Sequence, residues 1–305
     1  MSSHSYIKTD KNNNVNININ GELFHRKNAK ISVFDSGFLL GDGVWEGIRL
    51  HKSILVFIEE HLDRLYASAK GISLDITYSR KEIVNEIYKT LDANNMYDNI
   101  HIRLIISRGD KITPYQNPNT NVGPINLVII PEHKKADPNT YTKGVSIGRV
   151  PNIRPNENIL SPHYNTLSKL NCILASIEAN KLGYDEGIMN DINGNISTCN
   201  STNLFFIKNN QVYTSTGEYC LNGITRGKAI KICHENNINL TETDFTFEDI
   251  EESSEAFVTG TFAGIIPVSK LEGKELKSTN SNSLVNKIRI LYNKHIQDYT
   301  KKSFR

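Results

Sequence analysis

Alternating and helically spaced apolar residues divide the first half of the chain into predicted strands and helices. Val15, Ile17 and Ile19 alternate with asparagines before Asn20-Gly21, which predicts a strand that enters a tight hairpin turn. Alternation or β-branched residues predict strands over residues 15–19, 29–33, 100–106 and 125–130. Apolar residues at helical spacing predict helices over residues 62–69 and 83–91. The first half is therefore expected to combine one sheet with two helices.

The second half continues this mixture of strands and helices. A stripe of Leu167, Leu170, Leu174 and Ile177 predicts a helix that ends before Gly183. Turn residues predict hairpins at Asn193-Gly194 and Asn209-Asn210. Further strands are expected at 145–150, 255–258 and 265–268, and further helices from Ile224 and over 284–291.

The order of these elements favours two α+β domains, because strands and helices do not alternate strictly as in a doubly wound sheet. Residues 131–142 lack an apolar pattern and contain Lys134, Lys135 and Pro138. We therefore expect a small N-terminal α+β domain over residues 1–132, a linker over 133–142 and a larger C-terminal domain over 143–305.

Composition narrows the class of protein. The 305 residues include 35 Lys and Arg against 33 Asp and Glu, so no basic excess favours nucleic acid or an anionic membrane as a partner. No apolar run approaches a membrane span, and Met1–Asn14 lacks the apolar region of a secretory signal. The four cysteines are scattered, without a CxxC pair, so neither a disulfide framework nor a zinc site is expected. We expect a soluble, cytoplasmic protein without a metal.

Three short segments suggest an anion site. Gly223-Ile224-Thr225 opens a predicted helix, where free N–H groups and the helix dipole favour a phosphate. Thr259-Gly260-Thr261 ends a predicted strand, and Arg64 lies on the first long helix. Each segment also has a simpler interpretation. These are a helix start capped by threonine, a polar turn, and an exposed ion pair between Glu60 and Arg64.

Together, these segments occur in the order found in one family. Gly41–Arg49, Glu60–Leu65, Gly223–Arg226 and Phe257–Thr261 resemble motifs of the fold-type IV pyridoxal-phosphate enzymes. This family includes branched-chain aminotransferase, D-amino-acid aminotransferase and aminodeoxychorismate lyase. The resemblance implies a homodimer of two-domain chains that bind pyridoxal 5'-phosphate between the domains and act on an amino acid and a 2-oxo acid. It implies cofactor contacts from Arg64, Thr198, Gly223, Ile224, Thr225, Gly260 and Thr261.

Two positions depart from the family pattern. Asn165 stands where the resemblance implies the lysine that holds the cofactor covalently, thirteen residues before Glu178. Lys169 lies four residues further on, on the same face if the segment is helical. Lys169 is therefore our candidate for the catalytic lysine, and a solvated helix lysine is the alternative. Thr198 replaces the glutamate that would pair with the pyridine nitrogen, which weakens the cofactor as an electron sink.

Substrate contacts rest on the same resemblance. Arg49 and Arg103 match arginines near the substrate side of the branched-chain enzymes, and an arginine can bind a carboxylate through two parallel hydrogen bonds. Structural ion pairs are the alternative for both. Trp45 supplies an aromatic side chain, whereas Leu40 replaces an active-site tyrosine of the branched-chain enzymes.

Three functions remain open at this stage. The first is a class IV aminotransferase of the branched-chain-like type, with Lys169 as the proton carrier. The second is a non-catalytic homologue that binds pyridoxal phosphate, since Asn165 and Thr198 replace two functional residues. The third is a lyase of the same fold.

Overall fold

The computed structural model describes residues 3–303, which form two compact units. The N-terminal unit comprises Ile7–Lys135, the short segment Tyr164–Lys169, and Lys302 and Ser303. The C-terminal unit comprises residues 3–6, Ala136–His163 and Leu170–Lys301. Both units combine sheets with helices, which confirms the α+β class. The linker proposed at residues 133–142 remains a prediction.

The N-terminal unit is built on a six-stranded antiparallel sheet in the order β2-β1-β8-β5-β3-β4. Its strands are β1 (Asn16–Ile19), β2 (Glu22–His25), β3 (Gly43–His51), β4 (Ile54–Leu55), β5 (Ile100–Ser107) and β8 (Asn126–His133). A separate ribbon pairs β6 (Asp110–Lys111) with β7 (Asn121–Val122). The helices are η1 (Asp10–Asn14), α1 (Ser36–Leu40), α2 (Ile58–Gly71), α3 (Arg80–Ala93) and η2 (Pro118–Thr120).

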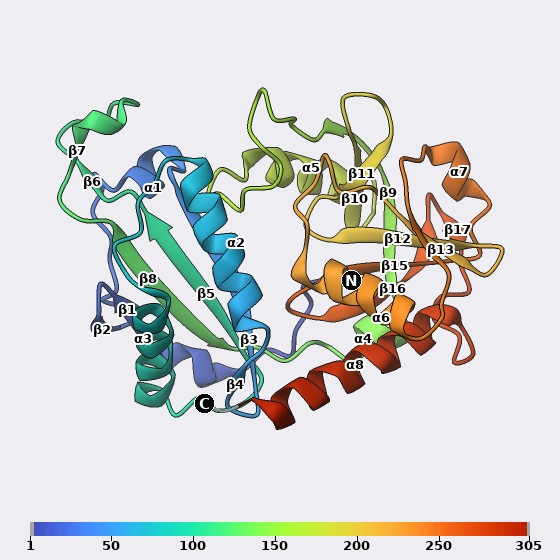
Figure 1. The fold of residues 1–305 in the computed structure, drawn as a ribbon, viewed down its shortest axis with the longest axis horizontal. Coiled ribbons are helices and arrows are strands. Elements are labelled where there is room, and N and C mark those ends of the chain that lie inside the picture. Colours follow the sequence, from blue (N-terminus) through green and yellow to red (C-terminus); the bar gives the residue numbers. More distant parts are fainter. Residues whose placement is uncertain (1–2, 304–305) are drawn as a thin grey trace. The chain divides into compact units, whose positions relative to one another are not determined.

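Helices α2 and α3 cover one face of this sheet (Figure 1). Alternate residues of a strand point to opposite faces, so Val44, Glu46 and Ile48 of β3 face the helices. All three are fully buried, and the two apolar residues belong to a core with Leu62 and Ile83 of the helices. The opposite face of β3 therefore carries Trp45 and Arg49.

Local sequence signals explain several boundaries in this unit. Asn20 and Gly21 adopt positive φ values of 54° and 87° in the β1–β2 turn, as the predicted hairpin requires. Ser79 and Glu82 form a reciprocal capping box at the start of α3. The strand predicted at residues 29–33 is wrong, because the partner of β1 is formed immediately after the turn by β2 and residues 29–33 pair with no strand.

The C-terminal unit is built on a nine-stranded mixed sheet in the order β11-β10-β9-β16-β15-β12-β13-β14, with β17 paired to β16. The strands are β9 (Val145–Ile153), β10 (Glu186–Asn190), β11 (Ile196–Cys199), β12 (Asn203–Lys208), β13 (Gln211–Thr214), β14 (Leu240–Glu242), β15 (Glu255–Gly260), β16 (Gly264–Leu271) and β17 (Lys274–Glu275). The helices are α4 (Asn139–Thr142), α5 (Leu170–Lys181), α6 (Ile224–Glu235), α7 (Phe247–Glu251) and α8 (Leu284–Lys302). Both predicted hairpins, β10–β11 and β12–β13, are present.

Helix α5 differs from its prediction in both its start and its buried face. It begins at Leu170, so Leu167 lies outside it. Its buried residues are Ala175 and Ala179, whereas Leu174 and Ile177 are exposed. The helix therefore packs through its small alanines, which contact Val150 and Met189, and not through the leucine stripe.

No helix among residues 3–303 combines the length and the apolar character needed to cross a bilayer.

Candidate active site

The start of α6 has features that suit an anion. Gly223 is the N-cap and forms no side-chain capping hydrogen bond, and the first N–H groups of a helix have no partner within it. The interpretation of Thr225 as an ordinary cap is therefore wrong. A Cβ at Gly223 would overlap the side-chain amide oxygen of Asn203, so a larger residue here would have to displace the Asn203 side chain. Thr225 follows inside the first turn and is 3% exposed.

The end of β15 lies beside the same asparagine. Thr259 is the register partner of Asn203, and its buried hydroxyl oxygen has no hydrogen-bond partner within residues 3–303. Gly260 ends the strand and Thr261 follows it. Unsatisfied N–H groups, a buried hydroxyl without a partner and close backbone approach are features that fit a phosphate group. The residues of the C-terminal unit thus fit the phosphate end of the expected cofactor.

Thr198 also belongs to the surroundings of Asn203. Its hydroxyl donates to the carbonyl of Thr202 at 2.7 Å and accepts from the Asn203 side-chain amide at 3.3 Å. The hydroxyl proton is therefore already engaged, so Thr198 can offer a further group only a lone pair. Asn203 was not singled out from the sequence, although it contacts three candidate positions.

Arg64 binds a buried carboxylate of the N-terminal unit. Its Nε and Nη2 each donate to Glu46 at 2.8 Å, and Nδ1 of His61 lies 2.7 Å from the same carboxylate. Burial raises the pKa of Glu46, but the charge and hydrogen bonds of Arg64, together with His61, lower it further, so the net shift is downward. Arg64 thus forms an ion pair with Glu46, which the sequence did not predict, and the Glu60–Arg64 pair stays a prediction.

Glu46 and His61 are positioning residues that the sequence analysis missed. A signal was present, because Glu46 alternates with Val44 and Ile48 on a strand whose other face is polar. A carboxylate on the apolar face of a strand must find a cation or a donor in the core. Arg64, on the covering helix α2, meets that need.

Three predicted substrate or catalytic residues lie together at the opposite face of β3, namely Trp45, Arg103 and Lys169. The Arg103 guanidinium stacks 3.7 Å from the centre of the Trp45 ring, and the Lys169 amine lies 5.8 Å from it. Burial lowers the pKa of Arg103. Arg49 lies on the same face and is opposite His101 in register. The structure thus brings Trp45, Arg103 and Lys169 together and holds the Arg64 ion pair on the other face of the strand.

Lys169 reaches Trp45 from a segment that is not helical. Trp45 donates its backbone N–H to the carbonyl of Asn165, and Leu167 donates to Gly43, so the segment pairs with β3. The assumption of a helical turn between Asn165 and Lys169 is therefore wrong. Asn165 is 1% exposed, and its side-chain amide donates to the Trp45 carbonyl at 2.7 Å. The residue at the expected lysine position is thus a structural link between the segment and the sheet.

One buried cysteine lies beside the anion site, because Cys220 accepts from the Asn203 side-chain amide at 3.5 Å. Cys199 packs in the hydrophobic core, and burial raises its pKa well above the usual range. Within residues 3–303, no cluster of three or more histidine, cysteine or acidic side chains is arranged to hold a metal ion.

Comparison with known proteins identifies relatives across most of the chain. Residues 43–271 match the family described as amino-transferase class IV. The chain is 35% identical over 92% of its length to branched-chain-amino-acid aminotransferase-like protein 1 of Arabidopsis thaliana, of which it covers 50%. It therefore spans about half the length of that relative. It is 34% identical over 90% of its length to a putative branched-chain-amino-acid aminotransferase of Methanocaldococcus jannaschii, and covers 93% of that protein.

A solved structure supports the same fold. The branched-chain aminotransferase of the thermophilic archaeon Thermoproteus uzoniensis, solved with norvaline, superposes with a TM-score of 0.83. The match covers 95% of this chain and 97% of the other at 26% identity. This likeness confirms the two-domain fold-type IV architecture.

Proposed function

Starting from a chain that belongs to the class IV aminotransferase family, we propose that it is a pyridoxal-phosphate-dependent aminotransferase of the branched-chain-like type. Its substrates are an amino acid and a 2-oxo acid. The observation that carries the proposal is the position of the Lys169 amine over the Trp45 ring, on the sheet face that also bears Arg103. This places an amine and a carboxylate-binding group on one surface, as amino-group transfer needs.

The residues of the C-terminal unit would hold the cofactor. The N–H groups that follow Gly223, with Thr225 and Thr261, would bind its phosphate. The family resemblance also implies Arg64 of the N-terminal unit, whose Nε and Nη2 already donate to Glu46. Thr198 would face the pyridine nitrogen with a lone pair. When bound, the cofactor supplies an electron sink for the bonds at the amino-acid α-carbon.

Three side chains of the N-terminal unit would act on the substrate. Lys169 would hold the cofactor covalently in the resting protein and then move a proton at the substrate α-carbon. Arg103 or Arg49 would fix the carboxylate through two parallel hydrogen bonds. Trp45 would exclude water from the reacting carbon and keep the Lys169 amine close to it.

Covalent trapping tests this assignment. Borohydride reduction of the cofactor-loaded protein should fix the cofactor on Lys169, located by peptide mass spectrometry, and a visible absorbance band should vanish in Lys169→Ala. Lys181→Ala, on the exposed end of α5, is the matched control and should keep the band. Phosphate-dependent binding without a covalent bond or keto-acid product would instead indicate the non-catalytic homologue. Product formation without conversion of the cofactor to its pyridoxamine form would indicate the lyase, because only transamination yields a keto acid together with pyridoxamine phosphate.

We further propose a cytoplasmic homodimer. Two apolar surfaces, one in each unit, support dimerisation because large exposed apolar patches are uncommon on monomers. One is formed by Leu170, Ile173, Leu174 and Ile177 of α5, and the other by Val33, Phe34, Phe38 and Ile112. Four free cysteines fit a reducing compartment. Light scattering should give twice the chain mass, and Leu174→Asp or Phe38→Asp should reduce it to one chain; a wild-type monomer would refute the dimer.

A further inference from the structure

A cavity of about 510 Å³ opens on the C-terminal unit away from the candidate cofactor residues. Its floor is apolar and consists of Phe247, Ile250 and Leu271, each no more than 4% exposed. Leu271, in the cavity floor, ends β16. Gly264, at the other end of that strand, pairs with Gly260, which is one of the candidate cofactor residues. Seven residues of extended chain separate these ends, roughly 23 Å at the usual rise per residue. The cavity is therefore distinct from the anion site at α6.

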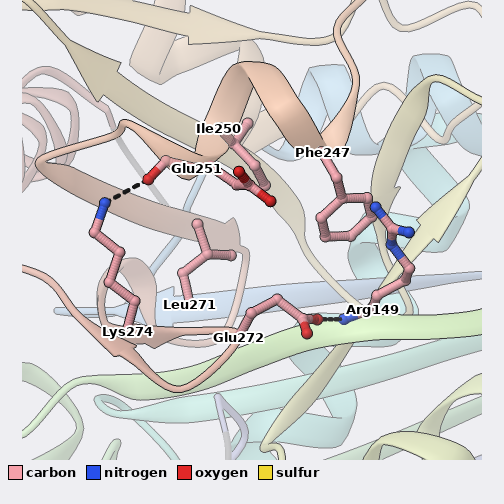
Figure 2. Close-up of a pocket in the computed structure, with 7 residues that line it drawn as sticks. All are labelled: Arg149, Phe247, Ile250, Glu251, Leu271, Glu272 and Lys274. Atoms are coloured by element: carbon pink, nitrogen blue, oxygen red, sulfur yellow. Dashed lines mark hydrogen bonds between the residues drawn. The ribbon is translucent and has the colours of Figure 1, made fainter.

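Four charged side chains form the rim, and two of them are already engaged. Figure 2 shows Lys274 donating to the Glu251 carbonyl, at the end of α7, and the Glu272 carboxylate accepting from the backbone N–H of Arg149. Glu272 also accepts from the Tyr184 hydroxyl at 3.4 Å. These contacts hold Lys274 and Glu272 in place. The two cations and two carboxylates of the rim carry no net charge.

The other two rim groups are available to a ligand. The Arg149 guanidinium stacks 3.8 Å from the centre of the Phe247 ring, and none of its N–H groups donates to a residue of the described range 3–303. Within the same range, the Glu251 carboxylate accepts no hydrogen bond. In Figure 2 these two groups lie on opposite sides of the Phe247 ring. A cation and an anion are thus held apart across an apolar floor.

We propose that this cavity binds a free α-amino acid with an apolar side chain, as a second site outside the catalytic centre. The carboxylate of the ligand would take two parallel hydrogen bonds from Arg149, and its ammonium group would pair with Glu251. The ligand side chain would lie against the small part of Phe247 and Leu271 that stays exposed. A net-neutral rim over an apolar floor matches a zwitterion better than a ligand with one charge, and the volume suits a small molecule.

The test follows the methyl groups of the floor in the full-length, cofactor-loaded protein. Methyl NMR signals of Ile250 and Leu271 should shift saturably on addition of leucine. Leucine methyl ester lacks the carboxylate and 4-methylpentanoate lacks the ammonium group, so each should bind at least about tenfold more weakly, the effect of losing one charge-assisted hydrogen bond. A leucine dipeptide separates its two charges and should also bind more weakly.

Substitutions at the rim connect the shifts to the proposed contacts. Arg149→Gln and Glu251→Gln should each weaken leucine binding at least about tenfold. Arg149→Lys should weaken it less than Arg149→Gln, because lysine keeps the positive charge but not the two parallel hydrogen bonds. Arg80→Gln is the matched control, since Arg80 also lies over an aromatic ring, that of Tyr66, outside this cavity. The proposal is overturned if leucine leaves both methyl signals unchanged, if the ester binds as tightly as leucine, or if both rim variants bind normally. These signals are read independently of turnover, so failure of the aminotransferase assignment would leave this result intact.

Discussion

Replacing Glu46 with glutamine is expected to destabilise the N-terminal unit by about 3–5 kcal/mol, the usual cost of breaking a buried ion pair from one side. The carboxylate is fully buried and accepts two bonds from Arg64 at 2.8 Å, with His61 at 2.7 Å. Glutamine has nearly the same shape but carries no charge. The variant therefore removes the charge of Glu46 from its pair with the Arg64 guanidinium, which is only 16% exposed.

The effect should depend on pH with a defined sign. Because the folded protein lowers the pKa of Glu46 below its usual 4.5, the carboxylate stabilises the fold above the unfolded-state value. That contribution is lost as the pH falls through the lowered pKa. The difference in unfolding free energy between wild type and Glu46→Gln should thus be constant near neutrality and shrink below about pH 4.5.

Urea unfolding, monitored by the fluorescence of the only tryptophan, Trp45, measures this difference, because that residue reports on the same unit. Asp63→Asn is the matched control. It breaks an exposed carboxylate pair with Arg80, 64% and 44% exposed, and should cost less than about 1 kcal/mol. A Glu46→Gln variant as stable as Asp63→Asn, or a difference that grows in acid, would refute the reasoning.

Four other substitutions test separate parts of the structure. Gly71→Ala should lower the free energy of unfolding by about 1–3 kcal/mol, because a Cβ there overlaps the Tyr164 ring. At Gly227 a Cβ meets no atom within 4 Å, so Gly227→Ala should stabilise α6 by about 0.5–1 kcal/mol. Thermal melts of the two variants measure both effects. Gly223→Ala should weaken pyridoxal-phosphate binding about tenfold, or ~1.4 kcal/mol, in a fluorescence titration, and unchanged affinity would exclude the α6 site. A thiol reagent should label half-exposed Cys172 quickly and the buried cysteines slowly, since burial raises the pKa of Cys233 to about 12. Cys172→Ser should remove the fast phase, and a fast phase that persists would contradict this assignment.

The sequence predicted correctly those helices and turns that are specified by residues close together in the chain. The hairpin at Asn20-Gly21 and the helix from Ile224 follow from turn chemistry and from helical spacing. The leucine stripe of α5 shows the limit of such patterns. An apolar face predicts burial but does not tell whether the same chain or a second one covers it, so the exposed side of α5 could not be assigned to a partner from spacing alone.

The site residues show the same limit. The motif containing Glu46 and the motif containing Arg64 were both visible, but the contact between them joins residues eighteen positions apart on a strand and a helix. Likewise, the family pattern located Asn165 correctly in sequence but gave no sign that its side chain would bind the Trp45 carbonyl. Lys169 was selected on the assumption of a helical turn, yet it reaches the Trp45 face from an extended segment.

The segment Tyr164–Lys169 packs with the N-terminal unit, although in the sequence it follows well after Lys135, where the main stretch of that unit ends. No single cut in the chain can therefore yield both units whole. A fragment that stops at residue 132 would leave the backbone of β3 without the partner that binds Gly43 and Trp45, and the remaining fragment would carry Lys169 without its aromatic neighbour. Two such fragments would have to reassociate to rebuild the edge of the sheet. Recovery of the proposed Lys169–cofactor bond on mixing the fragments would then measure how strongly the pairing of residues 164–169 with β3 holds Lys169 in position.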